Sequence, residues 1–465
     1  MINTINSACL SETIKIPVRD ECDVVIAGGG AAGVMAALAA AQNGAKTILI
    51  EQNTFLGGSL LGESGAWEGF FNVFKPYYTK QVQVVRGIPE LVRKQLQKRQ
   101  GSTGFYEEEL DNREETIRVH GDREEMPQLF LDMMKEYGVI LYLSSMVVDV
   151  VKEGNDLKGI IIAGKYGREA ILAKTVIDTT GNADVAYQAG VNCLNKKERR
   201  NAGIAFGMGN IDFIKVKEFA TQKNILSSLG YADKGGEHRD NITRLGLKIS
   251  ELDEIKPYLP KYCQSMHIII TSNHENRATQ VEGIRMKLDT TEVEEISKAY
   301  VTLNKCCFTI AGLLKKLIPG FENSFVDWTS PYLSIDFGRV VECEYDITRE
   351  DIENTVIPED TIGVLGVTSQ GCDTKGHWYG IPYRALIPKK VNNLLVAGKI
   401  ISSDDEAWES TRITGSCFLQ GQAAGTAAAI AVKNNCYVSK IDSNELRETL
   451  LAMGAFLGTT VNQSV

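Results

Sequence analysis

A glycine-rich turn between an expected strand and an expected helix is the feature that most constrains what this chain can fold into. The turn follows a short β-branched run at residues 24–27, which is typical of a buried parallel strand. Residues 33–43 (GVMAALAAAQN) are helix formers and small residues, and residues 47–51 (TILIE) predict a second strand. A strand, a turn, a helix and a second strand in about 30 residues match one mononucleotide-binding unit.

The spacing of the glycines in this turn points to a dinucleotide. Gly28, Gly30 and Gly33 form the pattern GxGxxG. Such glycines permit a tight turn and let the backbone approach a pyrophosphate, which the helix N-terminus attracts. Glu51 ends the second strand, where its carboxylate can accept hydrogen bonds from ribose hydroxyls. The expected contacts at this turn are Gly28, Gly30, Ala31, Ala32, Gly33 and Glu51.

Four later segments extend the expected cofactor site. QNTFLGGS at 52–59 holds a glycine pair that lets the backbone run beside a flavin, and TVIDTTGNAD at 175–184 is a strand followed by a glycine turn. NLLVAGKIIS at 393–402 predicts a buried strand ending in glycine, and RITGSCFLQGQAAGTAAA at 412–429 predicts a long helix. The remaining expected cofactor contacts lie in these four segments, in the strand expected at 147–151 and in the acidic run that follows residue 402. They are Gln52, Gly57, Gly58, Ser59, Val148, Thr180, Gly181, Asp184, Gly398, Asp405, Gly415 and Ser416.

With these motifs the chain resembles the FAD-dependent oxidoreductase family, whose fold is similar to that of the glutathione-reductase and succinate-dehydrogenase flavoproteins. The matching stretches are DVVIAGGGAAGVMAALAAAQNGAKTILIE at 23–51, VIDTTGNADVAYQAG at 176–190 and YGIPYRALIP at 379–388. The resemblance extends from about residue 16 onward and is weakest at 210–330. It implies FAD as the cofactor, hydride transfer between a small organic substrate and flavin N5, and a nearby side chain that moves the partner proton.

The resemblance also suggests candidates for catalysis. In family members the YxIPYR stretch precedes the flavin-facing strand, which would place four residues along one wall of the substrate pocket: His377, Tyr379, Tyr383 and Arg384. If the segment is extended, alternation puts the first three on a common face and turns Arg384 the other way. Tyr379 or Tyr383 is the first candidate for the proton donor, followed by His377, while packing in the core is the alternative for both tyrosines. Arg412 stands at a helix start, where the dipole disfavours a cation, so we expect it to bind an anionic group.

The expected fold class is α/β, a Rossmann-like FAD-binding domain with an inserted mixed α+β substrate domain. Nucleotide-type elements stand towards both ends of the chain, around a middle that is more polar and less regular and holds one long amphipathic helix at 293–317. The expected boundaries are 1–85, 120–200 and 355–440 for the discontinuous FAD-binding domain, 201–354 for the substrate domain and 441–465 for a C-terminal helical tail.

Charge and cysteine content exclude several other classes. Lys and Arg number 50 against 59 Asp and Glu, a net charge of −9, and no basic cluster stands out, so nucleic acid is not an expected partner. The ten cysteines are scattered without a CxxC pair, which argues against a metal site and for a reducing, cytoplasmic location. Residues 1–20 lack the pattern of a signal peptide, and glycines interrupt the uncharged stretch at 24–41, so no membrane span is expected.

Missing motifs narrow the type of flavoprotein. A pyridine-nucleotide–disulfide reductase needs a second GxGxxG and a redox cysteine pair, but the adjacent Cys306 and Cys307 lie inside an expected helix. A glucose-methanol-choline oxidase needs a histidine near its C-terminus, and none follows His377. Two alternatives stay open, a flavin electron-relay subunit without its own substrate pocket and a nicotinamide-dependent dehydrogenase. The expected partners are a small-molecule substrate and an unnamed electron acceptor or donor, and the sequence is compatible with a homo-oligomer.

Overall fold

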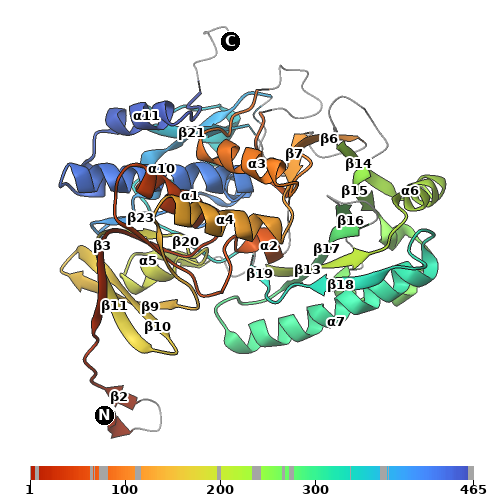
Figure 1. The fold of residues 1–465 in the computed structure, drawn as a ribbon, viewed down its shortest axis with the longest axis horizontal. Coiled ribbons are helices and arrows are strands. Elements are labelled where there is room, and N and C mark those ends of the chain that lie inside the picture. Colours follow the sequence, from red (N-terminus) through yellow and green to blue (C-terminus); the bar gives the residue numbers. More distant parts are fainter. Residues whose placement is uncertain are drawn as a thin grey trace.

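Two sheets of different type organise the chain, and each has its own hydrophobic core (Figure 1). One is a mixed seven-stranded sheet and the other is an antiparallel ten-stranded sheet, counted over the part of the chain that the structure describes. The computed structural model describes residues 2–5, 10–62, 66–67, 69–72, 82–109, 117–195, 201–232, 242–263, 268–271, 277–335, 337–366, 374 and 376–458.

The first sheet is a parallel layer extended by an antiparallel meander. Its strands run in the order β8-β4-β3-β11-β10-β9, and β23 pairs with the end of β11. The strands β8, β4, β3, β11 and β23 are parallel to one another, whereas β10 is antiparallel to both β11 and β9. Their bounds are β3 (Val18–Ala27), β4 (Thr47–Ile50), β8 (Ile140–Tyr142), β9 (Met146–Glu153), β10 (Asp156–Gly164), β11 (Gly167–Asp178) and β23 (Leu394–Val396). The α/β fold class is therefore correct.

Two buried helices cross beside this sheet, although they lie almost 400 residues apart in sequence. They are α1 (Ala31–Gln42) and α10 (Thr414–Lys433), and both are rich in alanine and glycine and buried along nearly their whole length. Figure 1 shows them side by side, red and blue. The other helices around the first core are α2 (Ser59–Gly62), α3 (Ile88–Lys98), α4 (Glu125–Glu136), α5 (Asp184–Gln188), α8 (Arg349–Glu353), α9 (Asp405–Thr411) and α11 (Ser443–Ala452).

The middle of the chain forms a regular sheet, so the expectation of a less regular middle was wrong. The order is β18-β13-β17-β16-β15-β14-β6-β7-β5, with β19 on β13. Three strands come from residues before 121, and the bounds are β5 (Ala66–Trp67), β6 (Phe105–Glu109), β7 (Ile117–His120), β13 (Asn201–Gly209), β14 (Leu226–Ala232), β15 (Ile242–Leu247), β16 (Ile268–Thr271), β17 (Arg277–Lys287), β18 (Phe325–Thr329) and β19 (Ser334–Ile335). Residues 339–353 instead pack in the first core.

The ten-stranded sheet has two chemically different faces. On one face, Leu229, Leu245 and Val281 pack against α7 (Val293–Leu317) and α6 (Phe213–Gln222). The opposite face carries Arg118, with 2% of its surface exposed, and Arg244, with 1% exposed. Alternation along a strand explains this separation, because successive side chains point to opposite faces.

Buried His120 on the same strand as Arg118 makes stability depend on pH. Burial lowers the pKa of His120 from 6.5, the positive charge of Arg244 lowers it further, and the negative charge of Asp122 opposes both effects. The net result is a pKa of about 4. Between these values the unfolded chain binds a proton that the folded chain does not, so a fall in pH favours unfolding. Relative to His120→Gln, the wild-type free energy of unfolding should drop by about 2–3 kcal/mol between pH 7 and pH 4.5. Urea unfolding at both pH values measures this, and identical pH dependence in the two proteins would contradict it.

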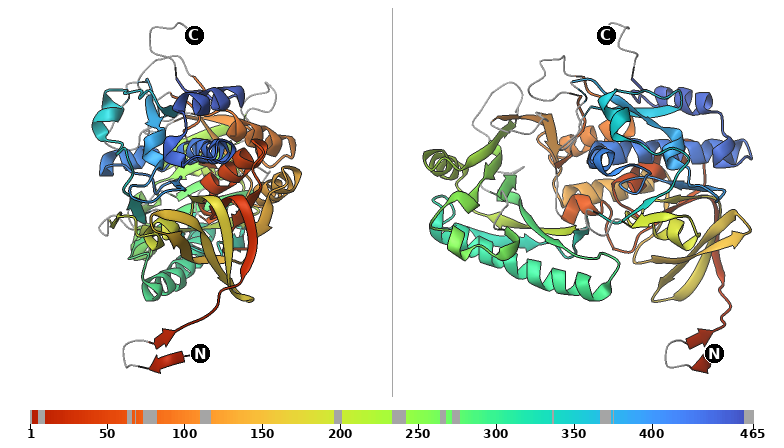
Figure 2. Two further views of the ribbon diagram at one scale, coloured as in Figure 1. Left: turned by 90° about the vertical axis from the view of Figure 1, so that its left-hand side faces the viewer. Right: turned by 180° about the vertical axis from the view of Figure 1, so that it is seen from behind.

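The remaining elements lie outside the two main sheets. The strands β1 (Ile2–Ile5) and β2 (Leu10–Glu12) form a hairpin that stands clear of both sheets, as Figure 2 shows from two sides. Two further pairs are β12 (Cys193–Asn195) with β20 (Arg339–Val341), and β21 (Thr361–Leu365) with β22 (Tyr379–Pro382). None of the helices in the described ranges combines the length and apolar character needed to cross a membrane.

Candidate functional site

The turn before α1 requires glycine at two positions. Gly28 has φ of +101°, and a Cβ there would lie 2.6 Å from the carbonyl oxygen of Thr179. A Cβ at Gly33 would lie 1.8 Å from the carbonyl oxygen of Gly28, inside the van der Waals radius. The Thr179 hydroxyl donates to the carbonyls of Ala27 and Gly28 and ties the turn to the end of β11. The first and last glycines of the pattern thus serve the tight turn and the close contact of α1 with β3.

The middle glycine faces open space. A Cβ at Gly30 would meet no described atom within 4 Å, and within the described residues no side chain caps α1, which begins directly after Gly30. The first N–H groups of a helix lack partners within the helix, so this end attracts an anion. Gly57 donates its N–H to the Gly29 carbonyl at 2.8 Å, and Gly58 (φ +52°) lies against Gly30. The second glycine pair therefore meets the first, and together they leave a backbone cradle that fits a pyrophosphate.

Glu51 lies beside this cradle and is not a solvated strand end, since only 6% of it is exposed. Its Oε2 accepts the N–H of Gly29 at 2.7 Å, and its Oε1 accepts the backbone and side-chain N–H groups of Asn53, both at 2.8 Å. A carboxylate offers about four acceptor positions, so one position remains for a ribose hydroxyl. The neighbouring Gln52 is exposed, and Ser59 is exposed at the start of α2.

We expect Glu51→Ala to weaken FAD binding by about 10- to 100-fold, because it removes a charged acceptor worth roughly 1.5–3 kcal/mol. Titration of the apoprotein with FAD, followed by quenching of flavin fluorescence, measures the change. Glu136→Ala, at the exposed end of α4, is the matched control and should bind FAD as the wild type does. A folded Glu51→Ala protein with wild-type FAD affinity would remove Glu51 from the cofactor site.

A second group of expected contacts lies at the ends of β9 and β11. Val148 is skipped in the pairing of β9 with β10, because Ile161 pairs with Asp149 and Ile162 with Val147. Such a bulge leaves the extra residue out of the ladder, so its backbone groups are available to an adenine.

The turn after β11 is held by a carboxylate that the sequence analysis missed. Asp178 is fully buried and accepts the Thr180 N–H, the Thr180 hydroxyl and the Ala186 N–H at 2.8–3.0 Å. Burial raises the pKa of Asp178 to about 6. Gly181 has φ of +74° in this turn, and Asp184 lies 3.3 Å from the guanidinium of Arg339. A buried acid at the end of an apolar strand was the available signal.

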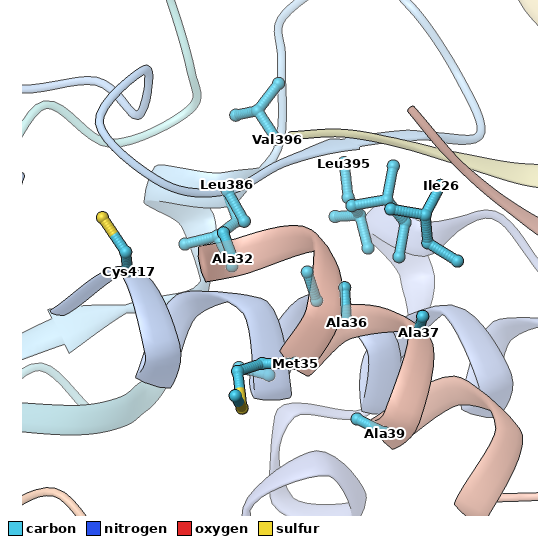
Figure 3. Close-up of a cluster of buried hydrophobic side chains, with 14 of the residues drawn as sticks. Ile26, Ala32, Met35, Ala36, Ala37, Ala39, Leu386, Leu395, Val396 and Cys417 are labelled. Carbon is cyan, nitrogen blue, oxygen red and sulfur yellow. The ribbon is translucent and has the colours of Figure 1, made fainter. Parts of the chain in front are cut away.

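The C-terminal motif closes onto the first turn. Gly398, two residues after the end of β23, lies against Ala32, and its N–H donates to the side-chain oxygen of Gln420 at 2.7 Å. The Gln420 amide donates in turn to the Thr411 carbonyl and the Ser416 hydroxyl, so this buried residue ties together strand, loop and helix. The sequence analysis did not single out Gln420. Figure 3 shows α1 and α10 crossing here, with Ala32, Ala36 and Cys417 among the buried side chains.

A match to a protein-family model identifies the family of this chain. The model of the FAD-dependent oxidoreductase family matches residues 23–450, which is most of the chain. The chain belongs to the FAD-dependent oxidoreductase family. FAD is therefore its cofactor, and the protein is an enzyme.

Individual relatives of this oxidoreductase are distant. A thiamine thiazole synthase of Methanococcus maripaludis is 28% identical over 170 residues, which are 35% of this chain and 56% of that protein, so the match spans little more than half of the relative. GidA of Aquifex aeolicus has a TM-score of 0.47 and 18% identity, and the match covers 89% of this chain and 64% of that one. A geranylgeranyl bacteriochlorophyll reductase-like protein of Thermoplasma acidophilum has a TM-score of 0.45 and 15% identity over 94% and 84% of the two chains.

The junction of α9 and α10 explains the cation at a helix start in this oxidoreductase. The guanidinium of Arg412 donates to the Glu409 carboxylate at 2.9 Å and 3.1 Å, and it lies 4.9 Å from the Trp408 ring. Glu409 is thus an anionic partner of Arg412, and the binding of an anionic ligand by Arg412 stays a prediction. Asp405 lies half-buried in the first turn of α9, and Gly415 and Ser416 lie buried in the first turn of α10.

The two candidate tyrosines of the oxidoreductase point to different places. The strand β22 ends at Pro382 and a 3-10 turn begins at Tyr383, so the extended alternation breaks there. Tyr379 is fully buried and donates its hydroxyl to the Ser410 hydroxyl at 2.8 Å, beside the start of α10. The Tyr383 hydroxyl instead donates to the Val438 carbonyl at 2.8 Å, on the side of α11.

The other two residues of the YxIPYR region lie at the surface. Arg384 pairs with Asp360 at 3.0 Å, and His377 is exposed. The structure therefore brings only Tyr379 of this group to the junction that holds Arg412.

Proposed function

We propose that this enzyme transfers a hydride between a small organic substrate and flavin N5. The observation that carries the proposal is the attachment of the ten-stranded sheet to the cofactor cradle. The hydroxyl of Tyr332, in the loop between β18 and β19, donates to the carbonyl of Gly58, one of the cradle glycines. An enclosing wall beside the flavin is what a substrate pocket needs, whereas an electron-relay subunit needs an exposed flavin edge.

Several further contacts support this enclosure. The Tyr332 ring stacks on Phe55 with centroids 5.4 Å apart, and a Cβ at Gly62 would lie 2.9 Å from the same ring. Arg123, which follows β7, lies 3.6 Å from the Trp328 ring and donates to the Leu61 carbonyl. The segment that follows the glycine pair is thus held between the two sheets.

The chain supplies binding, orientation and electrostatics. The cradle glycines and the start of α1 hold the pyrophosphate, and Glu51 holds the ribose. When bound, FAD supplies the two-electron redox chemistry. The first turn of α10 has no side-chain cap among the described residues, so its N–H groups would favour negative charge on a flavin bound beside it. Tyr379 is our candidate for the group that gives a proton to the substrate or orients its oxygen.

Anaerobic titration of the FAD-loaded enzyme with panels of small molecules tests the proposal. We expect one class of substrate to bleach the flavin absorbance, and deuterium at the transferred position to slow the bleaching. Reduction only by a protein donor would favour the electron-relay alternative, and release of NAD in place of FAD on denaturation would favour the nicotinamide alternative. The electron partner, the oligomeric state and a cytoplasmic location stay predictions.

A further inference from the structure

Residues 330–339, which connect β18 to β20 and contain β19, reach from the ten-stranded sheet to the cofactor side of the molecule. We call them the strap, of which residue 336 lies outside the described residues. Ser330 donates its N–H to the Ala205 carbonyl at 3.0 Å, and Tyr300 of α7 donates its hydroxyl to the Ser330 carbonyl at 3.1 Å. The strand β19 then pairs with β13. One end of the strap is therefore fixed on the ten-stranded sheet.

The strap first meets the cofactor side at the second glycine pair. The hydroxyl of Tyr332 donates to the carbonyl of Gly58, and the Tyr332 ring stacks on Phe55. A Cβ at Gly58 would lie 3.0 Å from the Cα of Gly30, so these two glycines are in close contact. The carbonyl that Tyr332 binds therefore belongs to the border of the cradle.

Two further contacts of the strap lie on other sides of the cradle. Lys399, in the segment after β23, donates its ammonium to the carbonyl of Ile335 in β19. The Lys399 side chain covers Gly181 in the turn after β11, since a Cβ at Gly181 would lie 3.1 Å from the Lys399 Cε. At the end of the strap, Arg339 donates to the carbonyl of Asn182 in the same turn at 3.2 Å.

The three contact regions surround the start of α1. The loop after β4, the turn after β11 and the segment after β23 each pack against the glycine turn or the first turn of α1. In the space between them, a Cβ at Gly30 would meet no described atom within 4 Å. A segment that contacts all three regions crosses the mouth of this space, and Figure 1 shows α2, β19 and β20 at the junction of the two sheets. A pyrophosphate bound at the start of α1 would therefore lie between the glycine turn and the strap.

We propose that the strap closes over bound FAD, and that the Tyr332 hydroxyl must leave the Gly58 carbonyl before FAD can enter or depart. FAD then exchanges only through an open state in which the strap and the cradle are separated. The contacts of the strap join two parts of the protein to each other, so they oppose entry and exit alike. The inference concerns the cofactor alone and holds for any substrate of the enzyme.

Tyr332→Phe tests the inference, because it removes the hydroxyl and keeps the ring on Phe55. Stopped-flow mixing of the apoprotein with FAD measures association, and exchange of radiolabelled FAD against an excess of unlabelled FAD measures dissociation. We expect both rate constants to rise by about 3- to 10-fold, the effect of one hydrogen bond on the opening step. The dissociation constant should change by less than about threefold, since the lost bond affects entry and exit equally.

Tyr300→Phe is the matched control, because it makes the same chemical change at the end of the strap that is fixed on α7. This variant should exchange FAD at the wild-type rates. Faster dissociation without faster association would show that Tyr332 binds FAD and does not control its passage, and would overturn the inference. Unchanged rates in Tyr332→Phe, or the same acceleration in Tyr300→Phe, would also overturn it.

Hydrogen exchange of the wild-type protein keeps the test decisive if Tyr332→Phe does not fold. Bound FAD should favour the closed state, so the amides of the strap should exchange more slowly in the FAD-loaded enzyme than in the apoprotein. Peptides from residues 293–317 of α7 serve as the internal reference. Equal exchange of the strap in the two forms would overturn the inference.

Discussion

Gly421→Ala should cost the enzyme both stability and FAD. A Cβ at Gly421 would lie 2.1 Å from the Ala32 carbonyl oxygen, and both atoms belong to helices that are fixed on the first core. Relief of this clash must move α1 away from α10, and α1 carries the N–H groups of the cradle. Alanine has a higher helix propensity than glycine by roughly 1 kcal/mol, but the clash outweighs this gain. We expect a net fall of about 1–3 kcal/mol in the free energy of unfolding. FAD affinity should fall by at least about tenfold, measured by titration of the apoprotein.

Gly312→Ala is the matched control, because Gly312 lies in the exposed part of α7 and a Cβ there meets no described atom within 4 Å. This variant should be more stable than the wild type by about 0.5–1 kcal/mol and should keep its FAD affinity. A Gly421→Ala protein that behaves like Gly312→Ala would show that α1 and α10 can separate without harm to the cradle.

Tyr379→Phe should lower the rate of flavin reduction by about 10²–10⁴-fold once a substrate is known. The change removes the hydroxyl and keeps the ring, so packing of β22 and the flavin spectrum should stay as they are. Stopped-flow reduction at saturating substrate measures the rate. The hydroxyl lies beside the junction of α9 and α10, 2.8 Å from the Ser410 hydroxyl, where a proton can pass between hydroxyl groups.

Tyr383→Phe separates this role from packing. Its hydroxyl bonds to the Val438 carbonyl on the far side of the 3-10 turn, so its loss should lower stability by about 1 kcal/mol and leave the rate unchanged. If both variants reduce the flavin at the wild-type rate, neither tyrosine moves the proton, and Arg412 becomes the group to test.

Local patterns predicted the glycine turn and two of the helices well. The turn at Gly28–Gly33, the helix expected at 33–43 and the long helix at 293–317 follow from contacts between residues near in sequence, and the structure has α1 at Ala31–Gln42 and α7 at Val293–Leu317. The glycine requirements also follow locally, because a positive φ or a close backbone approach admits only glycine.

Contacts between residues far apart in sequence could not be predicted from such local patterns. The strands β5, β6 and β7 join a sheet whose other members begin at residue 201, and nothing in their short sequences identifies β14 as the neighbour. Gln420 looked like one polar residue in an Ala/Gly-rich helix, and its role depends on the distant Gly398. Each of these features depends on which distant segments lie side by side in the fold. The spacing of apolar residues along the sequence does not encode that.

The pairing of β23 with β11 has a consequence for biosynthesis. The first sheet is completed by Leu394–Val396, and α10, which packs on α1, follows later still. During translation the amino-terminal half therefore waits on the ribosome with the docking surface of α1 uncovered while more than 200 residues are added. Such a nascent chain exposes apolar surface to chaperones and to aggregation. A complete FAD site therefore forms only after β23 and α10 have been synthesised, so flavin supply acts on a late stage of folding and not on the first.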